Sequence, residues 1–415
     1  MTDFVYPSMR MDNKEKLHMV KVKDVASQIR GVTFAKSDVL KHAEKGYVPV
    51  LRAGNIEDAT ASVSWSDIVY IPTEKVRQVQ FLRNNDVIIA ASSGSLAAIG
   101  KCAQFESNDA LCEDVSFGAF LKVLRLNAID VDPQYFAHYF RTKEYRAIIS
   151  HLASGANINN LRNQDIDNLE FYLPPLEEQR RIVEILDRAD AIRAKRRQLL
   201  ADYDELPRSL FLDMFGDMKA DKQVLDVIEK IRTGPFGSDL HHDEFVGSGI
   251  AVLGLDNVVS NEFRWVQRRY ITPEKYEKLK RYTVQPGAVL VSIMGTAGRC
   301  VVVPDNIPTA INTKHICAIT VNREILEPVF LRAVFLWHQQ ARIHLLHSVK
   351  GSIMDGLNMG IIKKMPVITP PLSLQREFAR RVEAIAAARA KVERALALDD
   401  ELFASLQSRA FRGAL

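Results

Sequence analysis

Two kinds of hydrophobic pattern occur along the chain, and the first is a series of short apolar runs. The runs at 86–91 and 289–293 are followed by Ser-Ser-Gly and by Met-Gly, respectively. Apolar runs of four to eight residues that end in Gly or Ser are typical of buried β-strands. Helical stretches are predicted between such runs, at 133–151 and 327–347. We therefore expect an α+β fold with similar domains built on twisted β-sheets with helices.

The second pattern has apolar residues three and four positions apart, with charged residues on the opposite face. It begins after Pro174-Pro175 and again after Pro370-Pro371, and a proline pair commonly precedes a helix. One such stripe alone is ordinary core packing, but two matching stripes favour two long antiparallel, coiled-coil-like helices that separate the domains. The stripes are Ile182, Ile185, Ala189, Ile192 and Leu199, and Phe378, Val382, Ile385, Val392, Leu396, Leu402 and Leu406.

The chain repeats itself, because similar segments recur in the same order about 200 residues later. Chance similarity would not keep one order over five segments, so the chain is a tandem duplication with pseudo-two-fold character. We expect domains at 1–172 and 217–368 and helical spacers at 173–216 and 369–415. The matched segments are 48–56 with 250–258, 71–75 with 271–275, 86–94 with 287–295, 100–102 with 298–300, and 173–180 with 369–376.

Charge and cysteine content are compatible with a nucleic-acid partner inside the cell. The chain has 55 Lys and Arg against 51 Asp and Glu, a net charge of +4, so a DNA-binding face would have to concentrate the positive charge. Cys102, Cys112, Cys300 and Cys317 lack Cys-x-x-Cys spacing, which predicts free thiols in a reducing compartment. The N-terminal residues do not resemble a signal peptide and no apolar run is long enough to cross a bilayer, so we expect a cytoplasmic protein without a membrane partner.

Motifs of catalysis are missing from the sequence. Gly295-Thr-Ala-Gly298 lacks the pattern of a dinucleotide-binding loop, and no phosphate-binding loop, nucleophile elbow or methyltransferase Asn/Asp-Pro-Pro-Tyr motif is present. Pro304-Asp305 is not followed by the Glu-x-Lys of a nuclease. His241-His242-Asp243 has no further ligand nearby for a metal. We therefore expect no catalytic residue, no metal and no directly bound cofactor.

Four features carry a resemblance that covers residues 20–415: the segments at 209–216, 233–240 and 249–257, and the repeated Pro-Pro-Leu-x-x-Gln-Arg. Together they resemble the specificity subunits of type I restriction–modification enzymes. The segment at 233–240 resembles the beginning of a target-recognition domain in that family, and 249–257 resembles the strand that follows it. Pro-Pro-Leu-x-x-Gln-Arg, present in both copies, is similar to the start of the family's helical regions, and 209–216 is similar to the end of the central one. The first half departs from the pattern, because Gly-Val-Thr-Phe-Ala-Lys stands at 31–36 where a Gly-Pro-Phe-Gly or Gly-x-Thr-Pro run is expected.

The resemblance implies a non-catalytic, sequence-specific DNA-binding subunit. It implies two adenine methyltransferase subunits bound to the helices and motor-nuclease subunits in the full complex, which methylate and cleave DNA. S-adenosylmethionine, ATP and Mg²⁺ would be bound by these partners. Each target-recognition domain would read one half of a bipartite site in double-stranded DNA. Reading two half-sites about one helical turn apart, ~34 Å, requires a rigid spacer, which paired helices provide.

Loop residues able to contact DNA are candidates for the interface. Arg and Lys pair with guanine, Asn and Gln pair with adenine, and hydroxyl and cationic groups bind phosphates. Each candidate has the alternative of being a solvated or turn-forming residue, as Asn55 and Asn257 at matched positions illustrate. The candidates are Lys36, Arg52, Asn55, Ser92, Ser93, Ser95, Lys101, Asn157, Asn159, Asn160 and Arg162 in the first half, and Ser238, His241, His242, Asn257, Arg299, Asn312, Lys314, His315, Lys350 and Ser352 in the second.

Two alternatives belong to other functional classes. The chain would be an enzyme in its own right, a nuclease or a fused methyltransferase, if it cleaved or methylated DNA without partners. It would be a coiled-coil interaction protein if its assembled complex bound no duplex.

Overall fold

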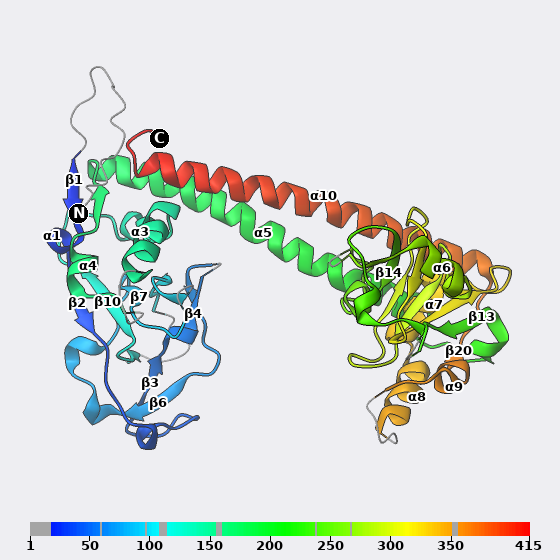
Figure 1. Cartoon of the computed structure of the whole chain (residues 1–415). Coiled ribbons are helices and arrows are strands. Elements are labelled where there is room, and N and C mark those ends of the chain that lie inside the picture. The colour runs from blue at the N-terminus through cyan, green and yellow to red at the C-terminus, as the bar shows by residue number, and fades with distance from the viewer. Residues whose placement is uncertain are drawn as a thin grey trace. The chain divides into compact units, whose positions relative to one another are not determined.

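The computed structural model describes residues 18–58, 60–95, 98–107, 114–154, 160–236, 239–265, 268–350 and 356–415 (Figure 1). The chain divides into two compact units. Unit 1 comprises Met1–Arg196 with Ala395–Leu415, and unit 2 comprises Arg197–Arg394. Two long helices, α5 (Leu176–Phe215) and α10 (Leu372–Ala410), each contribute one segment to either unit.

Unit 1 is built on a four-stranded antiparallel sheet in the order β2-β10-β7-β8. Its central strand β7 is buried along its whole length, which confirms the strand expected at 86–91. Unit 1 also has a three-stranded sheet in the order β6-β3-β9. This sheet contains a parallel pair, β3 with β9. The bounds are β2 Ala26–Arg30, β10 Leu121–Leu126, β7 Val87–Ala90, β8 Cys102–Gln104, β6 Val69–Pro72, β3 Tyr47–Leu51 and β9 Ser116–Phe117. Two small pairs complete the unit: β1 Met19–Lys21 with β11 Glu170–Tyr172, and β4 Ile56–Glu57 with β5 Ser62–Val63.

Unit 2 repeats this arrangement. Its four-stranded sheet has the order β13-β19-β16-β17 and its three-stranded sheet the order β15-β14-β18, again with one parallel pair, β14 with β18. The order of strands along the chain is also the same, so the expected tandem duplication is confirmed. The bounds are β13 Ile228–Thr233, β19 Ile316–Val321, β16 Val289–Ser292, β17 Cys300–Val302, β15 Tyr270–Ile271, β14 Ile250–Leu253 and β18 Ala310–Asn312, with a further pair of β12 Lys222–Gln223 and β20 Pro366–Val367.

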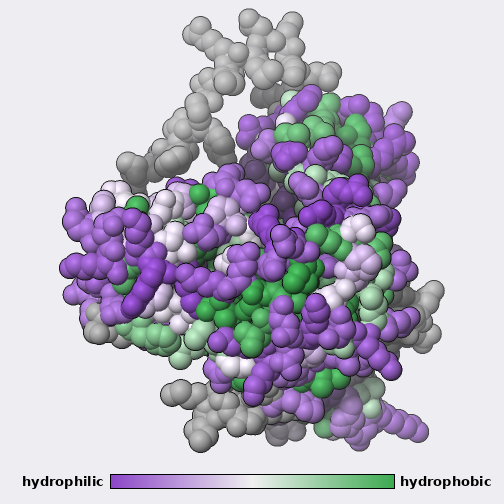
Figure 2. Space-filling model, turned by 90° about the vertical axis from the view of Figure 1, so that its right-hand side faces the viewer, coloured by the Kyte–Doolittle hydropathy of each residue, from purple (hydrophilic) through white to green (hydrophobic). Residues whose placement is uncertain are grey.

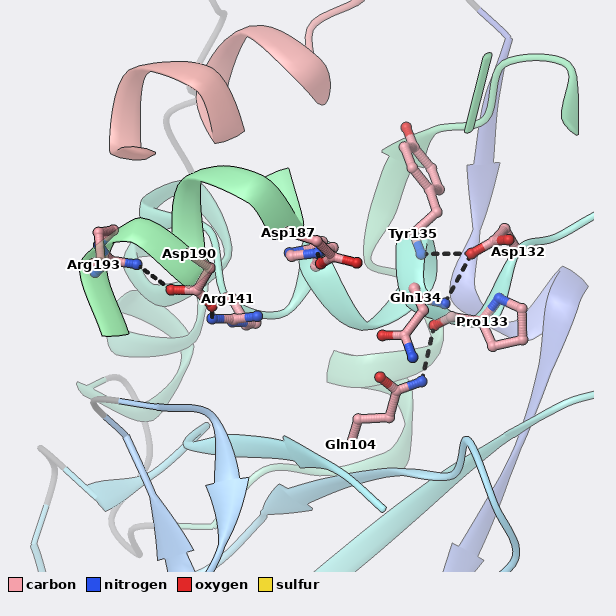
Figure 3. Close-up of polar contacts among 10 residues, drawn as sticks. Gln104, Asp132, Pro133, Gln134, Tyr135, Arg141, Asp187, Asp190 and Arg193 are labelled. Atoms are coloured by element: carbon pink, nitrogen blue, oxygen red, sulfur yellow. Dashed lines mark hydrogen bonds and ion pairs between the residues drawn. The ribbon is translucent and has the colours of Figure 1, made fainter. Parts of the chain in front are cut away.

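Short helices complete each unit, and most of them pack on one side of the large sheet, whereas the helix at 273–279 packs on the three-stranded sheet. Each predicted helical stretch is divided in two. In unit 1, Thr142 caps the second half of the stretch through Tyr145 N, and in unit 2 the backbone of His338 is extended. Asp132 caps the first half of the unit 1 stretch by accepting hydrogen bonds from two backbone N–H groups (Figure 3). The helices are α1 Val22–Val25, α2 Pro133–Tyr139, α3 Lys143–Ser154 and α4 Asn163–Asp167 in unit 1, and α6 Pro273–Leu279, α7 Pro328–Trp337, α8 Gln339–Lys350 and α9 Met359–Lys363 in unit 2.

The two long helices lie antiparallel within each unit. In unit 1, Arg193 Nε donates to Asp400 Oδ1 at 2.6 Å, and Arg196 is paired with Asp399. The Arg193 guanidinium also lies 4.2 Å from the centre of the Phe403 ring. Since the partner number falls as the residue number rises, the helices run in opposite directions. Figure 3 shows a neighbouring network, in which Asp190 lies between Arg193 of α5 and Arg141, just after α2.

The same pairing is made in unit 2 by different residues. Phe378 of α10 packs against Phe211 of α5 with 5.8 Å between ring centres, and Arg389 Nε donates to Asp204 Oδ1 at 2.7 Å. The expected fold class, two similar α+β domains with long antiparallel helices, is therefore confirmed.

The contact between the helices differs in detail from the predicted apolar seam. Ile192, Leu199 and Leu402 are 49%, 46% and 55% exposed, so they are not buried between the helices, and their predicted role in the spacer or in partner binding stays a prediction. Ion pairs of Arg with Asp, together with the buried Phe403, occupy the contact instead. Of the other predicted stripe residues, Ile182 and Phe378 are buried, whereas the remaining ones are partly buried, namely Ile185, Ala189, Val382, Ile385, Val392, Leu396 and Leu406.

Candidate nucleic-acid interface

In unit 1, three segments that are far apart in sequence meet where strand β7 ends. Ala90 of β7 is paired with Leu121 of β10, so the loop after β7 lies beside the turn before β10. Ala91 N and Ser92 N both donate to Phe120 O, at 2.9 and 3.1 Å. Leu161 N donates to Ala91 O at 2.8 Å, which adds a third segment. We call residues 91–95, 118–120 and 160–162 the loop edge of unit 1.

Unit 2 has the same arrangement at the end of β16. Ile293 N donates to His315 O at 2.9 Å, and Leu357 N donates to Ile293 O at 2.8 Å. The isolated bridge of Met294 with Gly356 corresponds to that of Ser92 with Asn160 in unit 1. Residues 293–299, 313–315 and 356–357 are the loop edge of unit 2.

A glycine allows the first strand of each large sheet to run against the neighbouring backbone at this edge. A Cβ atom added to Gly31 would lie 2.1 Å from Gly118 O, and one added to Gly234 would lie 2.0 Å from Asn312 O. No side chain fits at such distances, since both contacts are with backbone atoms. Gly31 therefore has the same role as Gly234, although the residues that follow it depart from the sequence pattern of the second copy.

The loop edges contain eight of the 21 predicted DNA-contacting residues. Lys101 lies next to the edge of unit 1, because its carbonyl oxygen accepts a hydrogen bond from Ala90 N at 2.8 Å. Arg162 is exposed and forms an ion pair with Asp165 at 3.0 Å. The predicted residues on the edges themselves are Ser92, Ser93, Ser95, Asn160 and Arg162 in unit 1, and Arg299, Lys314 and His315 in unit 2.

Two basic side chains at the loop edges have pKa values below their ordinary range. Burial, together with the neighbouring charge of Lys314, lowers the pKa of His315, so this imidazole is neutral at pH 7. Burial also lowers the pKa of Lys122, whose Nζ donates to Leu161 O at 2.7 Å. Lys122 thus holds the third segment of the unit 1 edge in place. The sequence analysis missed it because it lies within strand β10 rather than in a loop.

Three predicted asparagines are buried and hydrogen-bonded to the protein itself. Asn55 accepts from Arg52 N at 2.9 Å and donates to Ser66 O at 2.8 Å. Asn257, at the matched position, accepts from Gly254 N at 2.8 Å and donates to Arg264 O at 2.6 Å. Both asparagine side chains thus bond to the backbone of their own turns, which is the alternative to a contact with DNA. We leave both residues out of the proposed interface. We also leave out Asn312, which is fully buried and donates to Ile316 O at 2.8 Å.

The remaining predicted residues lie elsewhere. Lys36 and Arg52 are exposed and flank β3, and His241 and His242 are exposed in the segment before β14, so these four belong with the three-stranded sheets. Asn157, Asn159, Ser238 and Ser352 are outside the described residues, as is the side chain of Lys350.

The repeated Pro-Pro-Leu-x-x-Gln-Arg motif attaches each long helix to its domain. Gln179 Oε1 accepts from Asp132 N at 2.7 Å, and its Nε2 donates to two carbonyl oxygens, including Pro174 O at 2.8 Å. Gln375 repeats this arrangement, accepting from Glu327 N at 2.9 Å and donating to Pro370 O at 2.8 Å. Both glutamines are fully buried. The motif therefore fixes the direction in which each helix leaves its domain.

Neither a metal site nor a reactive thiol is found in the described part of the chain. No group of three or more His, Cys, Asp or Glu side chains is arranged for a metal there. Cys102, Cys300 and Cys317 are free and buried, and burial raises the pKa of each thiol to about 12. Cys112 lies outside the described residues. None of the described helices contains a stretch long and apolar enough to span a bilayer.

Comparison with known proteins decides the family. Residues 14–201 and 254–396 match the family described as type I restriction modification DNA specificity domain. The chain belongs to this family. The resemblance stated from the sequence is thus confirmed, and so is the prediction of a DNA specificity subunit that has no catalytic role of its own.

Individual members of the family are similar over almost the whole chain. The EcoKI specificity subunit of Escherichia coli K12 is 27% identical over 427 residues, which covers 95% of this chain and 88% of the relative. The StySPI specificity subunit of Salmonella potsdam is also 27% identical, with the same coverage over 436 residues. A solved chain from a study of complex assembly and conformational transition of the type I R-M system shares the fold, with a TM-score of 0.63 at 16% identity, covering 97% of this chain and 100% of that one.

Proposed function

We propose that each loop edge reads one half of a bipartite site in double-stranded DNA. The observation that carries this proposal is the repetition of the edge: Leu161 N bonded to Ala91 O in unit 1 and Leu357 N bonded to Ile293 O in unit 2. Both edges carry hydroxyl and cationic side chains, and the unit 1 edge also has the amide of Asn160. Such groups contact bases and phosphates. The candidates are Ser92, Ser93, Ser95, Lys101, Asn160, Arg162, Arg299, Lys314 and His315.

The domains and spacers that we propose for the chain follow the repeat. The recognition domains are 1–172 and 217–368, and the helical spacers are 173–216 and 369–415. The fully buried glutamines of the repeated motif attach the start of each long helix to its domain. This supports a rigid connection between each recognition domain and its helical spacer. Lys36, Arg52, His241 and His242 are secondary candidates, on loops away from the edges.

The partners proposed for the complex are two adenine methyltransferase subunits and motor-nuclease subunits, with S-adenosylmethionine, ATP and Mg²⁺ bound by them. Figure 2 shows the side of the molecule on which unit 2 lies, which is mainly hydrophilic with one hydrophobic area. On the helices of unit 1, the apolar side chains of Ile192, Leu398 and Leu402 are 49%, 65% and 55% exposed. We assign methyltransferase binding to this face. A cytoplasmic location is part of the proposal, and the three free, buried thiols are compatible with it.

The test is to map methylated adenines in the DNA of cells that carry this chain with its methyltransferase partner. The expected result is one site made of two short specified halves separated by unspecified bases. Cells that carry the partner without this chain are the control and should lack that methylation. A single continuous site, or methylation without sequence preference, would contradict the proposal. Cleavage or methylation by the isolated chain would favour an enzyme instead.

A further inference from the structure

Unit 2 contains a basic cleft next to its loop edge. The cleft has a volume of about 350 Å³ and lies between the loop that joins β16 to β17 and the helices α7 and α8. Arg299 enters it from the loop and Arg342 from α8, whose fourth residue it is. The other lining residues include Asn261, Thr296, Gly298 and Trp337.

The two arginines of this cleft are not neutralised. Among the residues that the structure describes, neither guanidinium group forms a hydrogen bond or an ion pair. No residue that lines the cleft carries a carboxylate. The adjacent Glu262 is paired with Arg264 at 2.7 Å. A third arginine, Arg332, uses its guanidinium to hold the cleft wall, donating to Asn261 O at 2.7 Å. Two unpaired like charges repel each other, so an anion between them is favoured.

The matched cavity in unit 1 contains carboxylates as well as cations. Arg146 is the fourth residue of α3, as Arg342 is of α8. In the cavity that Arg146 lines, the cations Arg141, Lys143 and Arg193 are accompanied by the carboxylates of Asp58, Asp400 and Glu401. Arg146 forms an ion pair with Asp58 at 4.0 Å and donates to Ile99 O at 2.7 Å. The two copies of the repeat therefore differ in charge at one and the same place.

We propose that the Arg299–Arg342 cleft of unit 2 binds a phosphate of the DNA backbone, a salt-sensitive contact without a counterpart in the matched cavity of unit 1. This inference rests on the proposed function of the loop edges. Guanidinium groups suit phosphate because their N–H donors match pairs of phosphate oxygens. Arg299 belongs to the loop edge of unit 2, so a duplex read by that edge passes beside the cleft. An acidic group of a partner protein is the competing occupant.

The test uses the chain assembled with its methyltransferase partner and a duplex that contains the mapped site. The affinity is measured against salt concentration for wild type, R299A, R342A and the double variant. Each phosphate contact contributes about −0.9 to the slope of log K against log salt. Because the two arginines share one phosphate, we expect the slope to become less steep by about one in the double variant and by no more than about one in either single variant. The methylated sequence should stay the same in R342A, which lies outside the loop edge, because phosphate contacts carry no base preference.

Two controls separate charge at the cleft from charge elsewhere. R281A removes an exposed arginine of the same unit, paired with Asp239 at 3.3 Å, and should keep the wild-type slope. R146A tests the matched place in unit 1 and should keep it as well. Thermal unfolding of each variant confirms that the measured protein is folded, and R299K/R342K, which retains both charges, should keep a slope close to wild type.

The outcomes distinguish this inference from the proposed function. A wild-type slope in the double variant, with sequence-specific binding intact, would overturn the phosphate cleft and leave the DNA-reading role standing. Loss of assembly with the methyltransferase at an unchanged slope would assign the cleft to a protein partner and overturn it too. A wild-type complex that binds no specific site would instead be a failure of the proposed function.

Discussion

The Phe411 ring lies 4.8 Å from the Tyr135 ring, centre to centre, so the residue that follows α10 packs on helix α2 of unit 1. Phe215 and Phe330 form the equivalent contact in unit 2 at 4.9 Å. In both units, the residue that follows or ends a long helix is anchored to the helix that covers the large sheet. Each domain is thus held by the start of one long helix and the end of the other.

Removing these rings is expected to destabilise each unit by a different amount. Phe215 is 1% exposed, so F215A should lower the free energy of unfolding by about 3–5 kcal/mol. Phe411 is only partly buried, and F411A should cost roughly 1–3 kcal/mol. Urea unfolding followed by fluorescence measures both, with F411L as the conservative control. Equal stability of F215A and wild type would show that the aromatic contact in unit 2 is not stabilising.

The buried glutamines of the repeated motif give a second prediction. Q179A leaves Asp132 N without its acceptor, and Q375A does the same to Glu327 N. Each unsatisfied buried group should cost about 1–3 kcal/mol. Glutamate is not a rescue, because it cannot donate to the two carbonyl oxygens that Nε2 contacts. Thermal unfolding of Q179A, Q375A, Q179E and Q375E checks this, and wild-type stability in Q179A would contradict it.

The pH dependence of unit 1 should involve Asp190. Burial alone would raise the pKa of this carboxyl, but Arg141 and Arg193 outweigh burial and hold the pKa below its ordinary value. A lowered pKa in the folded state means that the stabilisation is present above about pH 4 and is lost as the pH falls through the folded value. D190N should therefore be less stable at neutral pH and less sensitive to acid. Unfolding measured from neutral pH to pH 3 tests this, and parallel curves for D190N and wild type would exclude the effect.

The exposed apolar face of the unit 1 helices should bind the methyltransferase. L402E places a charge on this face and should weaken assembly at least tenfold, while changing the stability of the isolated chain by no more than about 0.5 kcal/mol. L402M keeps the apolar surface and is the matched control. Analytical ultracentrifugation with the purified methyltransferase measures assembly. Normal assembly of L402E would place the partner on another surface.

Much of the fold was predictable because it depends on local patterns. The apolar run at 86–91 and the proline pair before α10 gave a strand and a helix start directly. The parallel pairing of β3 with β9 was not predictable, since it joins segments far apart in sequence. The exposure of Leu402 and the burial of Phe403 were missed because spacing alone does not show that Arg193 pairs with Asp400 and stacks on Phe403.

Only the part of the candidate site that lies in loops could be predicted from the sequence. Loop residues near Gly and Ser, such as Ser92 and Arg299, were found from composition. Arg342 was missed, because it lies on a helix and meets Arg299 only in the folded chain. Its signal in the sequence is the arginine at the matched helical position, Arg146.

The measurement that tests the central claim most directly is a domain exchange. Residues 217–368 are replaced by those of a relative with a known and different target, and methylated adenines are mapped in cells that carry the chimaera with the methyltransferase. If each unit reads its own half-site, one half of the methylated sequence changes to that of the relative and the other half stays as in wild type. A change in both halves, or in neither, would contradict two independent readers.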